Sequence, residues 1–201
     1  MERGSAALLI IDMQNDFLHE KGYMGRRPER WGDVIKFRKP AIPRIRALAQ
    51  AMREMGVPVV HCQTMWGADY VDCGIPPLPD DDWREGFLVK GSFGARILDE
   101  LAPQPGDIVI ESKCFSKFPY TPLHLILQNK GVRTLIFTGV DTAACVESTV
   151  RDATALGYHC IITSDGTRGR SPHLQEVAEE RIADLFGAVM TCEEVTKLFR
   201  E

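Results

Sequence analysis

Short runs of aliphatic residues alternate with segments of helical periodicity along the whole chain, and this alternation constrains the fold more than any other feature. The aliphatic runs have the pattern of strands buried on both faces; they occupy residues 6–11, 57–62, 107–111, 132–138, 158–163 and 188–191. The spacing of apolar residues predicts helices at residues 40–55, 95–101, 121–130, 142–156, 172–186 and at the C-terminus. Such alternation predicts an α/β fold, in which helices cover both faces of a parallel sheet. No break in composition interrupts it, so we expect one domain over residues 1–201.

Two segments lie outside this pattern. Residues 13–39 are rich in Gly, Arg and Trp and are expected to be irregular. Residues 63–90 contain three prolines and the acidic run 80–82, which predict a long loop. A loop of this length inside a compact domain is usually a lid or a binding loop. Ten Lys or Arg residues against two acids lie between Lys21 and Arg53, which we interpret as a solvated face, with a basic rim around a site as the alternative.

Charge and cysteine content argue against several classes of protein. A formal net charge of −4 gives no general attraction to nucleic acid or to anionic membranes. The six cysteines form neither a CxxC pair nor a zinc-ligand spacing. The apolar stretch near the N-terminus is too short to span a bilayer and lacks a signal-peptide cleavage pattern. We therefore expect a cytoplasmic protein with reduced thiols, and with neither nucleic acid nor membrane as partner.

Three reactive side chains follow separate strands of the predicted sheet. Asp12 closes the first strand, Lys113 follows the third, and Cys145 lies in the first turns of the helix after the fourth. Parallel sheets bind ligands at the carboxyl ends of their strands, so these side chains are expected to meet. A carboxylate that leaves a buried strand needs a cation as partner. The free N–H groups and the dipole of a helix start lower a thiol pKa and can hold an oxyanion.

Each of these residues also has a structural interpretation. Asp12 can cap a helix or a loop, Lys113 can be a surface cation, and Cys145 can be a buried, inert thiol. Packing alone does not require an acid, a cation and a thiol at one edge of a sheet. The three together therefore favour a nucleophilic cysteine site.

Three motifs carry a family resemblance. IIDMQNDF, ESKCFSKF and GVDTAACVESTVRDA, in this order, resemble the isochorismatase-like cysteine hydrolase superfamily, and the similarity extends from residue 6 to about residue 185. The superfamily includes nicotinamidases, N-carbamoylsarcosine amidohydrolases and ureidoacrylate amidohydrolases. The resemblance implies a Rossmann-like three-layer α/β/α sandwich with a mainly parallel six-stranded sheet. It also implies a catalytic triad of Asp12, Lys113 and Cys145, and a homodimer or homotetramer.

The resemblance further implies the geometry around the nucleophile. A cis peptide bond is expected between Val140 and Asp141. The N–H of Cys145, together with that of Asp141 or Ala144, would form the oxyanion hole. The implied reaction is cysteine-dependent cleavage of a C–N bond in a small amide, ureido or carbamoyl compound, through a thioester and without a cofactor.

The branch of the family is less defined. Nicotinamidases hold a metal through an Asp and two His after the second strand, whereas HCQTMWGADYVDCG offers no such pair, so no metal is expected. The lysine and cysteine segments resemble the ureidoacrylate and biuret hydrolase branch, or the N-carbamoylsarcosine branch. Ala143 departs from the ureidoacrylate pattern, which commonly has Asn two residues before the nucleophile. This departure leaves the substrate open.

Loop aromatics and polar residues near the predicted edge are candidates for substrate contacts. The four predicted contacts are Asn15, Phe17, Trp66 and Phe118, with lid or core packing as the alternative. Arg168 and Arg170, after the fifth strand, are candidates to bind a substrate carboxylate. His61, which ends the second strand, is interpreted as structural.

Two other classes of protein share the α/β pattern. A dinucleotide-binding oxidoreductase is disfavoured because no GxGxxG follows the first strand. A non-catalytic small-molecule-binding protein on the same fold is an open alternative, because a fold does not by itself define a function. A nicotinamidase-type or maleamate-type amidase is the other alternative.

Overall fold

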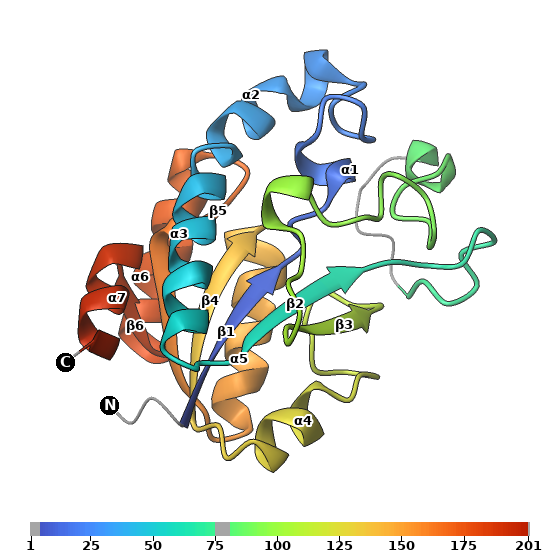
Figure 1. The fold of residues 1–201 in the computed structure, drawn as a ribbon. Coiled ribbons are helices and arrows are strands. Elements are labelled where there is room, and N and C mark those ends of the chain that lie inside the picture. The colour runs from blue at the N-terminus through green and yellow to red at the C-terminus, as the bar shows by residue number, and fades with distance from the viewer. Residues whose placement is uncertain (1–4, 75–80, 201) are drawn as a thin grey trace.

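A single parallel sheet forms the centre of the computed structural model, which describes residues 5–74 and 81–200 (Figure 1). Its strands are β1 (Ala6–Ile11), β2 (Val59–Thr64), β3 (Ile108–Ser112), β4 (Thr134–Val140), β5 (His159–Arg168) and β6 (Ala188–Met190). They lie in the order β3-β2-β1-β4-β5-β6, and every neighbouring pair is parallel. The predicted mainly parallel six-stranded sheet is confirmed. The strand order reverses between β1 and β4, and α/β sheets bind their ligands at such a switch point.

Helices cover both faces of the sheet. The helices are α1 (Asn15–Leu18), α2 (Pro28–Arg38), α3 (Ala41–Glu54), α4 (Leu123–Asn129), α5 (Glu147–Ala155), α6 (Pro172–Leu185) and α7 (Cys192–Arg200). Alternate residues of β1 pack into two different cores, because successive side chains of a strand point to opposite faces. Leu8 and Ile10 join the core beneath α3 and α7, whereas Leu9 and Ile11 join the core beneath α4, α5 and α6. In Figure 1, α3 lies in front of the sheet and α5 behind it.

A third hydrophobic cluster lies outside both sheet cores and is built from loops and short helices. It contains all three tryptophans of the chain, and its residues come from the two segments for which no strand was predicted, 13–39 and 63–90. The cluster consists of Tyr23, Met24, Trp31, Ile35, Trp66, Tyr70, Trp83, Phe87 and Leu88. We call it the aromatic cluster. It packs over the switch-point side of the sheet and supplies residues to the site described below.

The prediction that residues 13–39 are irregular is wrong, because α1 and α2 lie there. Helix α2 begins with Pro28 in its first turn, a position where the missing N–H of proline costs nothing. It buries Trp31, Ile35 and Arg38, which follow helical spacing. The sequence did not predict this helix because the buried stripe of α2 includes an arginine, Arg38, where an apolar residue is expected.

The helix predicted at residues 95–101 is also wrong, since only a 3₁₀ turn, Asp99–Leu101, forms there. The backbone of this segment is bonded to the loop after β1 instead. The carbonyls of Gly94 and Arg96 accept from the N–H groups of Asp16 and Asn15, each at 2.9 Å. Tertiary hydrogen bonds have thus replaced the helical ones.

The long loop after β2 has partly regular structure. Trp66 forms a β-bridge with Val89, and a 3₁₀ turn spans Asp81–Arg84. Prolines 76, 77 and 79 and Asp80, on which the prediction of a loop was based, lie outside the described residues. Among the residues that are described, no helix has the length and apolar character needed to cross a membrane.

Candidate active site

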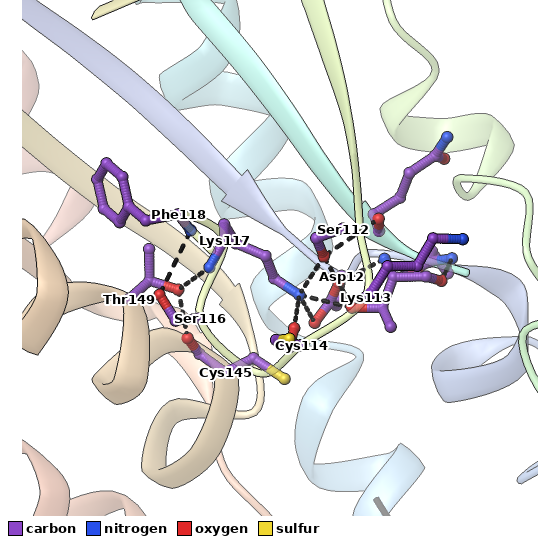
Figure 2. A network of polar contacts seen from close by, with 12 residues as sticks. Asp12, Ser112, Lys113, Cys114, Ser116, Lys117, Phe118, Cys145 and Thr149 are labelled. Atoms are coloured by element: carbon purple, nitrogen blue, oxygen red, sulfur yellow. Dashed lines mark hydrogen bonds and ion pairs between the residues drawn. The ribbon is translucent and has the colours of Figure 1, made fainter. Parts of the chain in front are cut away.

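Asp12 lies at the carboxyl end of β1, next to the switch point, and is completely buried. Its Oδ1 accepts hydrogen bonds from the backbone N–H and from the hydroxyl of Thr64, both at 3.0 Å. Its Oδ2 lies 2.8 Å from the Nζ of Lys117 (Figure 2). Both oxygens of the carboxylate are therefore held by groups on other elements.

Lys117, and not Lys113, is the cation paired with Asp12, so the predicted pairing is corrected. The Nζ of Lys113 lies 2.6 Å from Asp72 and donates to the carbonyl of Met65 at 2.8 Å. In β3, Ile110 and Ser112 are buried whereas Val109 and Glu111 are exposed, and Lys113 continues on the exposed side. The chain then bends back and brings the side chain of Lys117 beside Asp12. The motif ESKCFSKF contains both lysines. The one sequence signal that argues against Lys113 is the alternation of β3, which places the residue after Ser112 on the exposed side of the strand.

The ammonium of Lys117 is enclosed by oxygen atoms. It donates to the hydroxyl of Thr64 at 2.6 Å, to that of Ser112 at 3.2 Å and to the carbonyl of Cys114 at 3.3 Å. Burial lowers the pKa of Lys117, but the charge and hydrogen bonding of Asp12 and the charges of nearby thiols together outweigh it, so the pKa is raised overall. A completely buried lysine thus stays charged beside its carboxylate.

Cys145 lies in the π-helical turn Thr142–Val146, which joins β4 to α5. Its thiol is buried and lines the same cavity as Asp12, close enough for the carboxylate to act on its pKa. Burial raises the pKa of Cys145, and the negative charge of Asp12 adds to the effect. This is opposite to the lowered pKa expected from the helix start. The thiol is therefore protonated at neutral pH, with a carboxylate in place to accept its proton.

The turn before the nucleophile has the predicted cis peptide bond between Val140 and Asp141. The N–H of Ala144 donates to the carbonyl of Asp141 at 3.1 Å, so it is already used within the turn. Val140 is buried at the end of β4 and does not line the cavity. Of the predicted oxyanion donors, the N–H groups of Cys145 and Asp141 are the two that these contacts leave as candidates.

A cavity of about 350 Å³ opens above Asp12 and Cys145. The residues that line it are Asp12, Phe17, Met24, Arg38, Thr64, Trp66, Gly74, Phe87, Leu88, Lys113, Cys114, Phe115, Asp141, Ala144, Cys145 and Arg170. They come from the end of β1, from α1, from α2 and the segment before it, from β2 and the loop after it, and from the segments that follow β3, β4 and β5. The cavity is thus lined both by Cys145 and by residues of the aromatic cluster.

Comparison with known proteins agrees with this geometry. The isochorismatase domain matches residues 6–194. The chain belongs to the isochorismatase family. The sequence is 34% identical over 200 residues to the ureidoacrylate amidohydrolase RutB of Enterobacter sp. (strain 638), covering 92% of this chain and 85% of the relative. It is 35% identical over 199 residues to the RutB of a Methylorubrum extorquens strain, covering 92% of this chain and 79% of the relative.

Solved structures of this family have the same fold. N-carbamoylsarcosine amidase from Thermoplasma acidophilum superposes with a TM-score of 0.74 at 25% identity, covering 94% of this chain and 97% of that one. A cysteine hydrolase from Pseudomonas syringae pv. phaseolicola 1448A gives a TM-score of 0.88 at 24% identity, covering 100% and 94%. The isochorismatase-like resemblance seen in the motifs is confirmed.

Two of the four predicted substrate contacts line the cavity of this isochorismatase-family chain, and two do not. Phe17 and Trp66 are lining residues. Asn15 is buried and donates its side-chain N–H to the carbonyl of Phe93 at 2.9 Å. Phe118 stacks on Tyr158, with ring centroids 6.0 Å apart, in the core beneath α4 and α5. Neither Asn15 nor Phe118 therefore lines the cavity.

A cluster of two arginines and one acid forms the polar side of the cavity. Arg38, on α2, is 1% exposed, and its Nη2 lies 2.8 Å from Asp141. Arg170 approaches the same carboxylate oxygen at 3.4 Å. Arg168 does not line the cavity, because its Nη1 donates to the carbonyls of Ser164 and Thr167. The sequence suggested Arg170 but missed Arg38, whose helix it did not predict.

His61 has a structural environment away from this cavity. Its Nε2 lies 3.0 Å from a carboxylate oxygen of Asp107, which also binds Arg53. Burial lowers the pKa of His61 despite that carboxylate. These contacts fit the structural interpretation of the residue.

Proposed function

We propose that the chain hydrolyses a C–N bond of a small ureido, carbamoyl or amide compound, with Cys145 as nucleophile. Asp12 is the proton acceptor, and Lys117 is the cation that orients it. One observation carries this proposal: the buried carboxylate of Asp12 pairs with the ammonium of Lys117 and lines the same cavity as the thiol of Cys145. The curated relatives are amidohydrolases by name, which supports the same reaction type.

The chemistry follows from the protonation states. Asp12 takes the thiol proton as the sulfur attacks the carbonyl carbon, so the thiolate forms only when substrate is present. Asp12 then returns the proton to the leaving nitrogen, and the acyl group remains on Cys145 as a thioester. Water, deprotonated by the same carboxylate, hydrolyses the thioester. Lys117 remains charged throughout and balances Asp12 in a site without bulk water.

The oxyanion is held by backbone donors. The N–H of Cys145 and that of Asp141 are the proposed pair, because the N–H of Ala144 is bonded within the turn. Donors of this kind act on charge that develops only in the transition state. Loss of one such donor typically costs about 3 kcal/mol of transition-state stabilisation.

The substrate is proposed to carry an anionic group. Arg38 and Arg170 both contact the single carboxylate of Asp141. These three side chains together therefore carry a net charge of about +1. An arginine fork binds carboxylates well, particularly where water is excluded. Two relatives are named for ureidoacrylate and for N-carbamoylsarcosine, which are a ureido acid and a carbamoyl acid. We therefore favour a ureido or carbamoyl acid.

An ammonia-release screen tests the proposal. Carbamoyl, ureido, maleamate-like and nicotinamide compounds are offered to the wild-type chain and to Cys145→Ala. We expect release from one or more ureido or carbamoyl acids by the wild type, and none above background by the variant. Turnover by Cys145→Ala at the wild-type rate would refute the assignment of the nucleophile. Failure of the wild type on every ureido, carbamoyl and amide compound would favour a binding protein.

Assembly and location stay predictions. We expect a homodimer or homotetramer, which light scattering coupled to size exclusion measures directly. We also expect the protein in the cytoplasm, which fractionation of the native cells would test.

A further inference from the structure

We infer that the substrate carries an apolar group, of about the size of a phenyl ring or an isobutyl chain, in addition to its carbamoyl and acid groups. This inference rests on the proposed function and narrows its substrate class. It comes from the apolar residues that line the cavity, which we call the apolar wall and which none of the proposed chemical steps uses. Six lining residues form this wall: Phe17, Met24, Trp66, Phe87, Leu88 and Phe115.

The size of the cavity exceeds the needs of a linear ureido acid. Its volume of about 350 Å³ lies within the range of pockets that enclose drug-sized ligands, roughly 300–1,000 Å³. The reacting carbonyl needs only the region near Cys145, and an acid group needs only the region near Arg38 and Arg170. The remaining space is bounded by the apolar wall. Water there would find few hydrogen-bond partners, so an apolar substituent is the occupant that suits it.

The wall is preformed. The ring of Phe87 contacts Phe17 edge to face at 5.4 Å between centroids and lies 6.2 Å from Trp66. The buried residue Asp16 links the segment after α1 to the loop after β2. Its carboxylate accepts hydrogen bonds from the N–H of Tyr23 and from that of Leu88, both at 2.7 Å. Such anchoring reduces the ordering that a ligand would otherwise have to impose.

The three sides of the cavity thus define three parts of one ligand. The thiol faces a carbonyl, the arginine pair faces an acid, and the apolar wall faces a side chain. N-carbamoyl amino acids with aromatic or branched side chains have these three parts. Burial of such a side chain is worth enough to raise affinity by about ten- to a hundred-fold over a compound without it.

Matched N-carbamoyl amino acids test the inference with the full-length chain. Ammonia release is measured for N-carbamoylglycine and for both enantiomers of N-carbamoylleucine and N-carbamoylphenylalanine. We expect kcat/KM to be about ten- to a hundred-fold higher for at least one compound with a side chain. Turnover of N-carbamoylglycine with an equal or higher kcat/KM would overturn the inference and leave the proposed function intact.

A binding measurement decides the inference even if none of these compounds is hydrolysed. The Cys145→Ala protein is titrated calorimetrically with 3-phenylpropionate and with propionate. Tighter binding of the phenyl compound, by about ten-fold or more, is the expected result. Equal affinities, or no binding of either acid, would overturn the inference.

A wall variant locates the effect. Phe115 is 44% exposed, so Phe115→Ser should not disturb the cores, and it should reduce the affinity ratio of the two acids. Tyr120→Ser is the matched control, because Tyr120 is 91% exposed and does not line the cavity. An unchanged ratio in Phe115→Ser would overturn the assignment of this wall as the apolar contact surface.

Discussion

The two sides of the cavity are built in opposite ways. The reacting side uses buried charges, Asp12 and Lys117, attached to or just after strands of the sheet. The apolar wall uses aromatic and aliphatic side chains from α1 and from loops that no strand carries. The sheet positions Asp12 and the turn that carries Cys145, because the register of the strands determines where each strand ends. The loops shape the space around it and can vary without disturbing that register.

The difference also appears in the energetics. Removing one partner of a buried ion pair leaves the other charge unpaired, which costs about 3–5 kcal/mol. Shortening a side chain of the apolar wall removes contacts and leaves space, which costs less when the change is small. Substitutions on the reacting side should therefore act on kcat and on stability, whereas those on the apolar wall should act mainly on KM.

The largest expected effect comes from Lys117→Met. We expect kcat to fall by about a thousand-fold, and the free energy of unfolding to fall by about 3–5 kcal/mol, because Asp12 loses its counter-charge. Lys113→Met is the matched control. Its ion pair with Asp72 is partly exposed, so its removal should cost at most about 1 kcal/mol. Steady-state kinetics and urea unfolding measure both. A larger loss of kcat in Lys113→Met would reverse the assignment of the lysine.

Alkylation of Cys145 tests the protonation state of the reacting side. Because its pKa is raised, the thiolate fraction in the free protein should increase about ten-fold per pH unit, or about a hundred-fold from pH 7 to pH 9. The rate is followed by iodoacetamide labelling and mass spectrometry of the peptide that contains Cys145. A rate that is already constant at pH 7 would mean that the resting site holds a thiolate–ammonium pair.

Phe87→Leu tests the apolar wall. This residue is completely buried and contacts both Phe17 and Trp66. We expect KM for a substrate with an apolar side chain to rise by about ten-fold with kcat largely kept, and a loss of about 1–1.5 kcal/mol in stability. A fall in kcat with unchanged KM would show that the wall acts on the chemistry, and would remove the contrast between the two sides.

Thr149→Val should give the smallest effect on the reacting side. The buried hydroxyl of Thr149 donates to the carbonyl of Cys145 at 2.6 Å and accepts from the N–H of Lys117 at 3.3 Å (Figure 2). Its loss should lower kcat by about five-fold and stability by about 1 kcal/mol. Thr196→Val removes a similar bond within α7, to the carbonyl of Cys192, and is the control. Equal kinetics in the two variants would mean that Thr149 is only a helix-stabilising residue.

The sequence predicted the sheet more reliably than the loops. Six aliphatic runs located all six strands, because central strands such as β1 and β4 are buried on both faces and the partly exposed edge strands β3 and β6 still contain short aliphatic runs. The same reasoning placed Asp12 and Cys145 at one sheet edge, where both line the same cavity. It failed for α2, whose buried stripe includes Arg38, and for residues 95–101, whose backbone bonds to the loop after β1.

The sequence alone thus determined the α/β fold and the placement of Asp12 and Cys145, the proposed acid and nucleophile, at one edge of the sheet, because local periodicity and the ends of strands are encoded in short stretches of chain. Only the tertiary structure decided which lysine pairs with Asp12, that Arg38 faces the cavity, and that Phe118 does not. Each of these outcomes depends on the path by which a segment outside the sheet comes back to the edge of the sheet. That path is set by contacts between residues far apart in the chain, such as the bond from the N–H of Lys117 to Thr149, which no local pattern encodes.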